Sequence, residues 1–253
     1  MPVSRDQLHE YLNQYLNSVN FQDYAPNGLQ VCGKGNIKTI VTGVTACQPL
    51  LDAAVKVKAD AVLVHHGYFW KGESPVISGM KYHRLKTLLT HDINLFAYHL
   101  PLDAHPVVGN NAQLAKHMDW AIAGEFDTGS APSIGLVGAP KKPCSAQVLA
   151  KQLQQILKRE PLVVSPHNKP IKTLAWCTGA AQDFIEAAAC AGVDAYITGE
   201  ASERTFHAAQ ELGIHFFAAG HHATERYGVQ ALGKQLAELF DVSVKFIDID
   251  NPI

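Results

Sequence analysis

Two stretches of this chain resemble one another closely enough to constrain its architecture. Ile171-Lys172-Thr173-Leu174 repeats the pattern of Ile37-Lys38-Thr39-Ile40, and the offset is 171 − 37 = 134 residues. Asp194-Ala195-Tyr196-Ile197-Thr198 repeats Asp60-Ala61-Val62-Leu63-Val64, and 194 − 60 is again 134. A constant offset across strand, helix and strand indicates an internal duplication. Because this order with short links is typical of parallel βαβ units, we expect an α/β fold.

Capping residues mark where several helices are expected to begin. Ser4 with Gln7, and again Thr45 with Gln48, match the capping-box pattern ahead of apolar residues at helical spacing. Ser145 is expected to cap a helix of the second half. The pattern therefore predicts one opening helix and one further helix in each repeat.

The length of 253 residues suits one large domain or two modest ones. Residues 128–142 are rich in Gly, Pro and Ser, which favours a junction there. We expect a first α/β repeat over 1–127 and a second over 128–253. The two halves are expected to be intertwined, and we allow for the final helix and strand to pack on the first half.

Composition narrows the functional classes. Lys and Arg number 21 against 23 Asp and Glu, so no basic field favours duplex nucleic acid. Five cysteines without a CxxC pair favour free thiols in a reducing compartment, most simply as small buried hydrophobic residues. No run approaches the ~18 apolar residues of a membrane span, and the N-terminus lacks a signal-peptide core. We therefore expect a cytoplasmic protein without membrane contact.

Histidines follow three strand-like runs from distant parts of the chain. The first run ends in His65-His66-Gly67, the second in His99 followed by Asp103, and the third in His221-His222 followed by Glu225. Ligands of open α/β sheets bind at the carboxyl ends of the strands. One such histidine is most often only a solvated residue, but three coincidences favour a metal site.

Proline residues shape the segment after His99. Pro101 and Pro106 disfavour a regular helix there, so we expect Asp103 and His105 on a constrained loop.

Residues 67–79 read as an insertion that contains Tyr68, Phe69 and Trp70. These aromatic side chains could cover a substrate or simply pack on the adjoining helix, and the sequence does not separate the two.

These motifs resemble the Nif-three-like family, whose bacterial members are called type 2 homologues of GTP cyclohydrolase I. The resemblance covers essentially the whole chain and is carried by Asn27-Gly28-Leu29-Gln30, His65-His66-Gly67, His99-Leu100-Pro101-Leu102-Asp103, Thr198-Gly199-Glu200 and Gly220-His221-His222-Ala223-Thr224-Glu225. It implies two intertwined, duplicated α/β/α halves with mixed, mostly parallel sheets. It also implies a dinuclear metal centre and a homo-oligomer, often a toroidal hexamer.

Carried over position by position, the resemblance places the metal ligands on His65, His66, Asp103, His221 and Glu225. His99 and Glu200 match residues that line the same cleft. Imidazoles and carboxylates without thiolate suit two divalent transition-metal ions such as zinc, iron, manganese or cobalt. Such a pair acidifies a bridged water for hydrolysis.

We expect Glu225 to bridge the two ions, with His65 and His221 on one and His66 and Asp103 on the other. His99, or else Glu200, is expected to be the catalytic acid or base. His222 is expected to orient a neighbour rather than to bind metal.

Two functions follow. The first is a metal-dependent hydrolase of a nucleotide or similar small molecule, including the ring-opening hydrolysis of GTP that the resemblance implies. The second is a scaffold or interaction protein whose metals are structural. Because five ligands for two ions leave coordination positions open, we favour the enzyme. The sequence holds no Walker-type phosphate loop, so the nucleotide rests on the resemblance.

Overall fold

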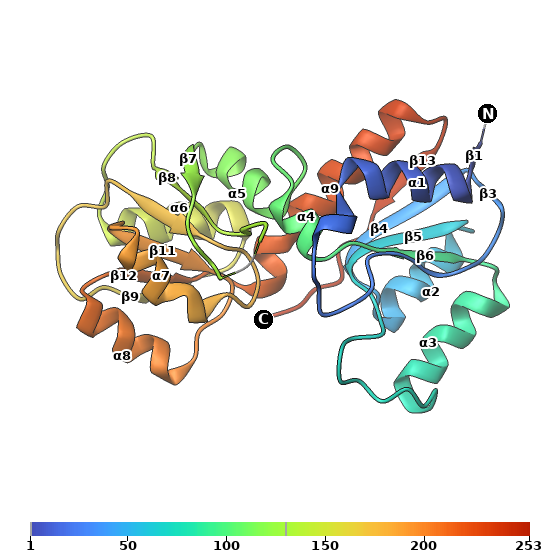
Figure 1. The fold of residues 1–253 in the computed structure, drawn as a ribbon, viewed down its shortest axis with the longest axis horizontal. Coiled ribbons are helices and arrows are strands. Elements are labelled where there is room, and N and C mark those ends of the chain that lie inside the picture. Colours follow the sequence, from blue (N-terminus) through green and yellow to red (C-terminus); the bar gives the residue numbers. More distant parts are fainter. Residues whose placement is uncertain (1, 130) are drawn as a thin grey trace. The chain divides into compact units, whose positions relative to one another are not determined.

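The computed structural model describes residues 2–129 and 131–253 (Figure 1). The chain forms two compact units: the first holds the chain up to Leu102 together with Gly228–Asp250, and the second holds Asp103–Tyr227 with Asn251–Ile253. This division by compactness differs from the division by repeats at residue 127, because the chain returns to the first unit after Tyr227.

The first unit is built on a five-stranded sheet in the order β13-β4-β5-β6-β2. Neighbouring strands run parallel, except that β2 is antiparallel to β6. The strands are β2 (Gly28–Val31), β4 (Thr39–Thr45), β5 (Ala61–His66), β6 (Asn94–Ala97) and β13 (Ser243–Phe246), and a small antiparallel pair joins β1 (Val3–Ser4) to β3 (Asn36–Ile37).

Helices and apolar side chains complete the first unit. Its helical segments are α1 (Arg5–Tyr15), the 3₁₀ turn η1 (Ser18–Asn20), α2 (Gln48–Lys56) and α3 (Gly79–Thr90). A buried cluster joins strand residues such as Val62 and Leu95 to Leu50 of α2 and Leu88 of α3. Burial of these side chains, about 1.5–3 kcal/mol each, is the main force that holds the sheet to its helices.

The second unit contains a six-stranded mixed sheet in the order β7-β8-β10-β11-β12-β9. Only β10, β11 and β12 pair in parallel, so this sheet is less parallel than expected. Its elements are β7 (Ala121–Glu125), β8 (Leu136–Ala139), β9 (Leu162–Val164), β10 (Leu174–Trp176), β11 (Ala195–Thr198), β12 (His215–Ala218), α5 (Asn110–Met118), α6 (Ala146–Leu157), η2 (Gln182–Phe184), α7 (Ile185–Cys190) and α8 (Glu203–Leu212).

Two helices span the division between the units: the short α4 (Leu100–Ala104) and the long α9 (His221–Leu239). The stretch 128–142, expected to be a junction, lies within the second unit and contains β8; residue 130 lies outside the described residues.

The duplication is visible in the strand register. Ile40 pairs with Ala61 across β4 and β5, and Leu174 pairs with Ala195 across β10 and β11, each shifted by 134. Asp60 Oδ2 accepts the backbone N–H groups of residues 38 and 39 at 3.0 and 3.1 Å. Asp194 Oδ2 accepts those of residues 172 and 173 at 2.8 and 2.9 Å. Each repeat thus uses one carboxylate to fix the entry into its first central strand.

The offset changes before the third strand ends. Tyr98 N donates to Val64 O and Ala219 N donates to Thr198 O, so the local offset is 219 − 98 = 121. His99 therefore corresponds to Gly220, and His221 lies one residue further along as the first residue of α9. His99 and His221 are therefore not equivalent positions of the two repeats.

The predicted helix starts had mixed outcomes. Ser4 and Gln7 form the capping box of α1, and Ser145 caps α6, both as predicted. The predicted box at Thr45 and Gln48 is wrong, because α2 begins after Cys47 without a side-chain cap.

The segment after His99 also differs from expectation, since residues 100–104 form α4 and Asp103 lies on this helix instead of a loop. Pro101 fits there because the first turn of a helix does not need its N–H.

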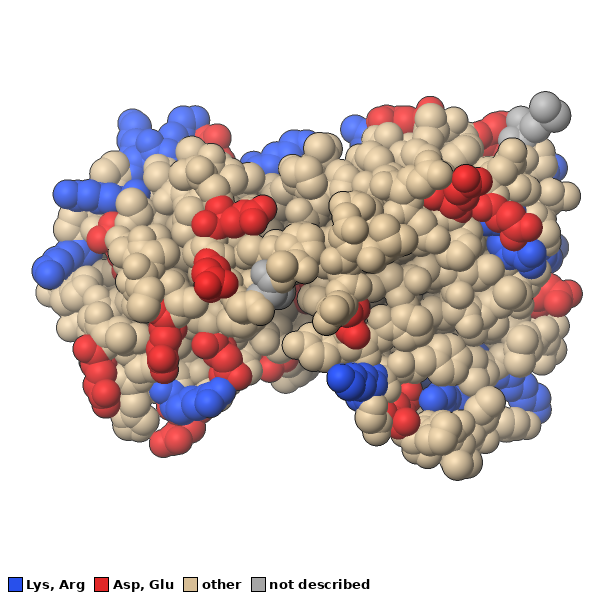
Figure 2. Space-filling model, in the orientation of Figure 1, with Lys and Arg blue, Asp and Glu red and all other residues tan. Residues whose placement is uncertain are grey.

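The α/β fold with mixed, partly parallel sheets is confirmed. Acidic and basic side chains are interspersed over the face shown in Figure 2. Among the described helices, none combines the length and the apolar character that a membrane span needs.

Candidate metal site

Three histidines of the first unit lie together at the carboxyl end of its sheet. His65 and His66 are the last two residues of β5, and His99 follows β6, the neighbouring parallel strand. Their rings are 4.5 to 5.7 Å apart between centroids. One ring nitrogen of each lies within 4.8 Å of the others, which is close enough to share a metal ion. His65 is fully buried, whereas His66 and His99 are half-buried.

Each of these rings is held through its Nδ1 atom. His65 Nδ1 donates to Tyr98 O at 3.0 Å, and His99 Nδ1 donates to Asp23 Oδ1 at 2.7 Å, since these oxygens can only accept. His66 Nδ1 lies 3.1 Å from Thr45 Oγ1. A neutral imidazole that donates from Nδ1 carries its lone pair on Nε2, which is the arrangement seen around metal-binding histidines.

The side chain of Asp23, in the turn before β2, is 2% exposed and anchors His99. Besides the imidazole, its carboxylate accepts the backbone N–H groups of Tyr24 and Leu100 and the side-chain amide of Asn27. Burial alone would raise the pKa of Asp23, but these hydrogen bonds and the positive charge available on His99 lower it to about 2. The carboxylate therefore stays ionised and orients His99.

The second unit places one histidine between two carboxylates at the start of α9. His221 Nδ1 donates to Glu200 Oε1 at 2.6 Å, and His221 Nε2 lies 3.2 Å from Glu225 Oε2, one helical turn along. Burial lowers the pKa of His221, but Glu225 and Glu200 outweigh it and raise the pKa to about 9. The pair of carboxylates thus favours a cation at Nε2, which a proton or a metal ion can provide.

Asp103 is also buried in the second unit and is held by polar neighbours. Its Oδ1 accepts from Asn110 Nδ2 at 2.8 Å and from Thr178 Oγ1 at 3.3 Å. Asn111 Nδ2 donates to the backbone oxygen of Asp103 at 3.3 Å. This helix position on α4 is therefore fixed by α5, the helix that follows it.

No cysteine belongs to the groups of potential metal ligands found among the described residues. Cys177, the one fully buried thiol among the described cysteines, lies near Asp103 and Glu225. Burial and the negative charges of these carboxylates raise the pKa of Cys177 well above its ordinary value. Imidazole nitrogens and carboxylate oxygens remain, and these fit borderline divalent ions such as zinc, iron or manganese.

Comparison with known proteins identifies the lineage. The family model described as Duf34/NIF3 (NGG1p interacting factor 3) matches residues 3–252. The chain belongs to the Duf34/NIF3 family. The resemblance drawn from the histidine motifs is thereby confirmed.

Members of the Duf34/NIF3 family match over the full length. A protein of Pseudomonas aeruginosa named GTP cyclohydrolase 1 type 2 homolog is 54% identical over 252 residues, covering 100% of both chains. One of the same name from Escherichia coli K12 is 55% identical over 251 residues, covering 99% of this chain and 100% of its own.

Solved structures agree with the fold. The protein ybgI, titled as of unknown function, has a TM-score of 0.96 at 53% identity, with 99% of this chain and 100% of that chain covered. TTHA1606 from Thermus thermophilus has a TM-score of 0.87 at 33% identity, covering 99% of each chain.

Sequence reasoning missed several residues that support the family motifs. Asp23 and Asn110 were not predicted as residues that support the site. Thr45 had been read as a helix cap. No local pattern signals these roles, because they depend on contacts between separate elements, for instance between Asp23 and His99, which are 76 positions apart.

Other predicted residues have separate roles. His105 Nδ1 accepts the backbone N–H groups of Val107 and Val108, and so folds the loop after α4. His222 donates its backbone N–H to Ile253 O.

The aromatic insertion divides between core and surface. Tyr68 is 5% exposed, belongs to the core cluster of the first unit and donates its hydroxyl to Ala46 O. Phe69 is 38% exposed. Trp70 is half-buried, with its ring 5.1 Å from that of His99 and 5.9 Å from that of His66. Only Phe69 and Trp70 therefore remain candidates for substrate contact.

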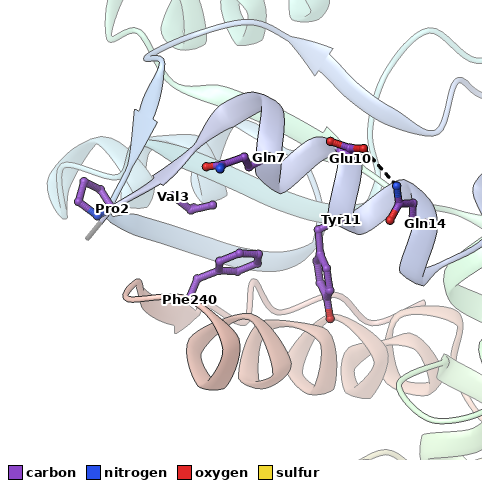
Figure 3. A pocket seen from close by; sticks show the side chains of 7 residues that line it. All are labelled: Pro2, Val3, Gln7, Glu10, Tyr11, Gln14 and Phe240. Atoms are coloured by element: carbon purple, nitrogen blue, oxygen red, sulfur yellow. Dashed lines mark hydrogen bonds between the residues drawn. The ribbon is translucent and has the colours of Figure 1, made fainter.

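A surface hollow of about 470 Å³ lies elsewhere in the first unit, between α1 and the segment after α9 (Figure 3). Tyr11 and Phe240 meet edge to face across it, and Gln14 donates to Glu10. Its lining includes one carboxylate and neither histidine nor cysteine, so it does not have the chemistry of a metal site.

Proposed function

We propose that this protein is a dinuclear metal-dependent hydrolase that acts on a nucleotide or a similar small molecule. The observation that carries the proposal is the hydrogen-bonding pattern that the histidines share. His65, His66, His99 and His221 each have Nδ1 hydrogen-bonded within the fold, so each would coordinate a cation through Nε2.

We propose that the ligands come from both repeats: His65, His66, Asp103, His221 and Glu225. If bound there, two divalent ions would make a bound water acidic enough to act as hydroxide near neutral pH. Glu225 is the candidate residue to contact both ions, because a carboxylate has two oxygens, whereas an imidazole whose Nδ1 is hydrogen-bonded would coordinate through Nε2 alone.

His99 is the proposed proton donor or acceptor for the leaving group. Its Nε2 exchanges the proton, while Asp23 fixes the ring through Nδ1. The hydrogen bond from His221 to Glu200 gives Glu200 the better-supported role of positioning His221. The name shared by the relatives, GTP cyclohydrolase 1 type 2 homolog, makes GTP the first substrate to test.

The proposal is tested by elemental analysis of protein purified without chelator or affinity metal, followed by a hydrolase screen with the metal found. We expect close to two ions per chain and turnover of a nucleotide. Fewer than one ion per chain in zinc-, iron- and manganese-supplemented preparations would refute the dinuclear site. Two ions without turnover across the screen would favour the scaffold function.

Two variants test the bridge. Glu225→Ala is expected to lower occupancy at both positions, whereas His66→Ala is expected to empty mainly one. Equal single-ion losses in both variants would make Glu225 a terminal ligand.

A further inference from the structure

We infer that Trp70 is a stacking surface for a planar aromatic ring of the substrate, such as a nucleobase. The inference deepens the proposed function and rests on it only for the identification of the histidines as a substrate site. It starts from the position of the indole. Trp70 lies beside His99 and His66, with its plane at 85° to the His99 ring. A ring stacked on this indole would lie next to the proposed acid or base.

The loop that carries Trp70 is anchored on both sides of the indole. Before it, Tyr68 is buried, and Gln30 of β2 accepts from Tyr68 N at 2.7 Å and donates to Tyr68 O at 3.1 Å. After it, Glu73 N donates to Trp70 O at 2.9 Å. The indole is fixed as well, because Trp70 Nε1 donates to Gly67 O at 3.2 Å. Trp70 is therefore preorganised and does not have to be ordered when a ligand binds.

The backbone of Phe69, next to Trp70, has a conformation that a phenylalanine does not favour. Its φ is +66°, a left-handed conformation that a bulky side chain rarely adopts. The strained residue is stabilised from outside, since Phe69 N donates to Glu73 Oε2 and the Lys81 ammonium lies 5.0 Å from the Phe69 ring centroid. Backbone strain of this kind concentrates at functional sites. The next residue is Trp70, whose ring lies close to those of His66 and His99.

Tyr24 supplies a second aromatic side chain near His99. Its ring centroid is 6.5 Å from that of His99, and its side chain is 63% exposed. The backbone links it to the loop, because Lys71 N donates to Tyr24 O at 2.6 Å. An exposed tyrosine and a half-buried tryptophan beside the same histidine form a surface that suits a flat apolar ring and provides no aliphatic pocket.

The three tryptophans make the inference directly measurable. Trp120 and Trp176 are 6% and 0% exposed, so Trp70 is the one that a ligand in solution can reach. We expect GTP to quench part of the tryptophan fluorescence of the zinc-loaded protein, and inorganic tripolyphosphate, which has no ring, to leave it unchanged. ATP and CTP extend the test to other bases.

Calorimetric titration of variants assigns the contact. Trp70→Leu is expected to weaken nucleotide binding about 5- to 150-fold, the range that corresponds to a base stacked on an aromatic side chain, whereas Trp70→Phe retains most of it. Phe206→Leu, at a 51% exposed aromatic residue of α8, is the matched control and should bind as the unaltered protein does. Tyr24→Leu changes a 63% exposed side chain, so it should not affect folding. Its nucleotide affinity tests the inference if Trp70→Leu does not fold.

The outcomes separate this inference from the proposed function. Unchanged nucleotide affinity in Trp70→Leu and Tyr24→Leu would refute stacking, and so would tripolyphosphate binding as tightly as GTP. Absence of binding by GTP, ATP and CTP to protein that holds two ions would also refute it. Metal content and hydrolysis of non-aromatic substrates would still stand as independent tests of the hydrolase.

Discussion

Gly179 offers the most discriminating test of how the carboxylate of Glu225 is accommodated. This glycine follows β10 in the second unit and has a φ of +73°. A Cβ added there would clash with Glu225 Oε1, and it would lie 3.3 Å from both Glu225 Cδ and His221 Nε2. Gly179→Ala is therefore a perturbation of one atom aimed at two proposed metal-site residues.

We expect Gly179→Ala to lower both the free energy of unfolding and the affinity for metal, for two different reasons. The left-handed conformation costs an alanine roughly 1–2 kcal/mol, which lowers the free energy of unfolding. The clash is relieved by movement of the Glu225 carboxylate, because this is the far end of a flexible side chain, so little further stability is lost. Displacement of a site group by about 1 Å is enough to cost on the order of 10²-fold in function. Metal affinity should therefore fall by about 10- to 100-fold.

Gly192 provides the matched control. Its φ is also +73°, and an added Cβ would meet no atom within 4 Å. Gly192→Ala should thus show the backbone cost alone. We would measure urea unfolding and zinc affinity for both variants. If Gly179→Ala loses stability as Gly192→Ala does but binds zinc like the unaltered protein, then Glu225 does not need the space that Gly179 leaves, and the reasoning is wrong.

Further expectations concern His99, its anchor and the acid stability of the second repeat. His99→Ala should keep the metal and lower turnover by about 10²- to 10⁴-fold, whereas loss of metal would make His99 a ligand. Asp23→Asn should lower turnover by about 10- to 100-fold in steady-state assays, and an unchanged rate would remove Asp23 from the positioning of His99. Burial raises the pKa of Asp194, but hydrogen bonds from the residue 172 and 173 backbone outweigh it and lower the pKa. Its stabilisation is therefore present above the unfolded pKa of about 3.9 and is lost as pH falls through the lower folded value. The stability deficit of Asp194→Ala in thermal unfolding should shrink below about pH 4, and a deficit independent of pH would contradict this account.

The sequence could predict what depends on local pattern. The offset of 134 placed the central strands of both repeats, and Ser4 and Ser145 located two helix starts, since capping acts over three or four residues. Thr45 shows the limit of that pattern. The sequence pattern predicts that Thr45 caps a helix. In the structure its hydroxyl is instead hydrogen-bonded to His66, and α2 begins after Cys47 without a side-chain cap.

Positions of side chains from distant segments could not be predicted in the same way. Pairing of Asp23 with His99 depends on where the turn before β2 lies against the end of β6. The burial of Tyr68 and the half-exposure of Trp70 depend on a strained backbone between them. No periodicity in the sequence encodes a single left-handed residue such as Phe69, so the aromatic insertion remained undivided until the structure was available.

The carboxylates of Asp60 and Asp194, which accept equivalent backbone N–H groups in the two repeats, have an evolutionary consequence. Both repeats kept the group that fixes the strand entry, while the residues at the opposite strand end diverged, so that the positions of His65 and His66 in one repeat are Gly199 and Glu200 in the other. The residues that stabilise the fold and the candidate ligand residues thus lie at opposite ends of the same strand. Substitutions at the ligand end can change which ion is preferred without disturbing how the repeat assembles.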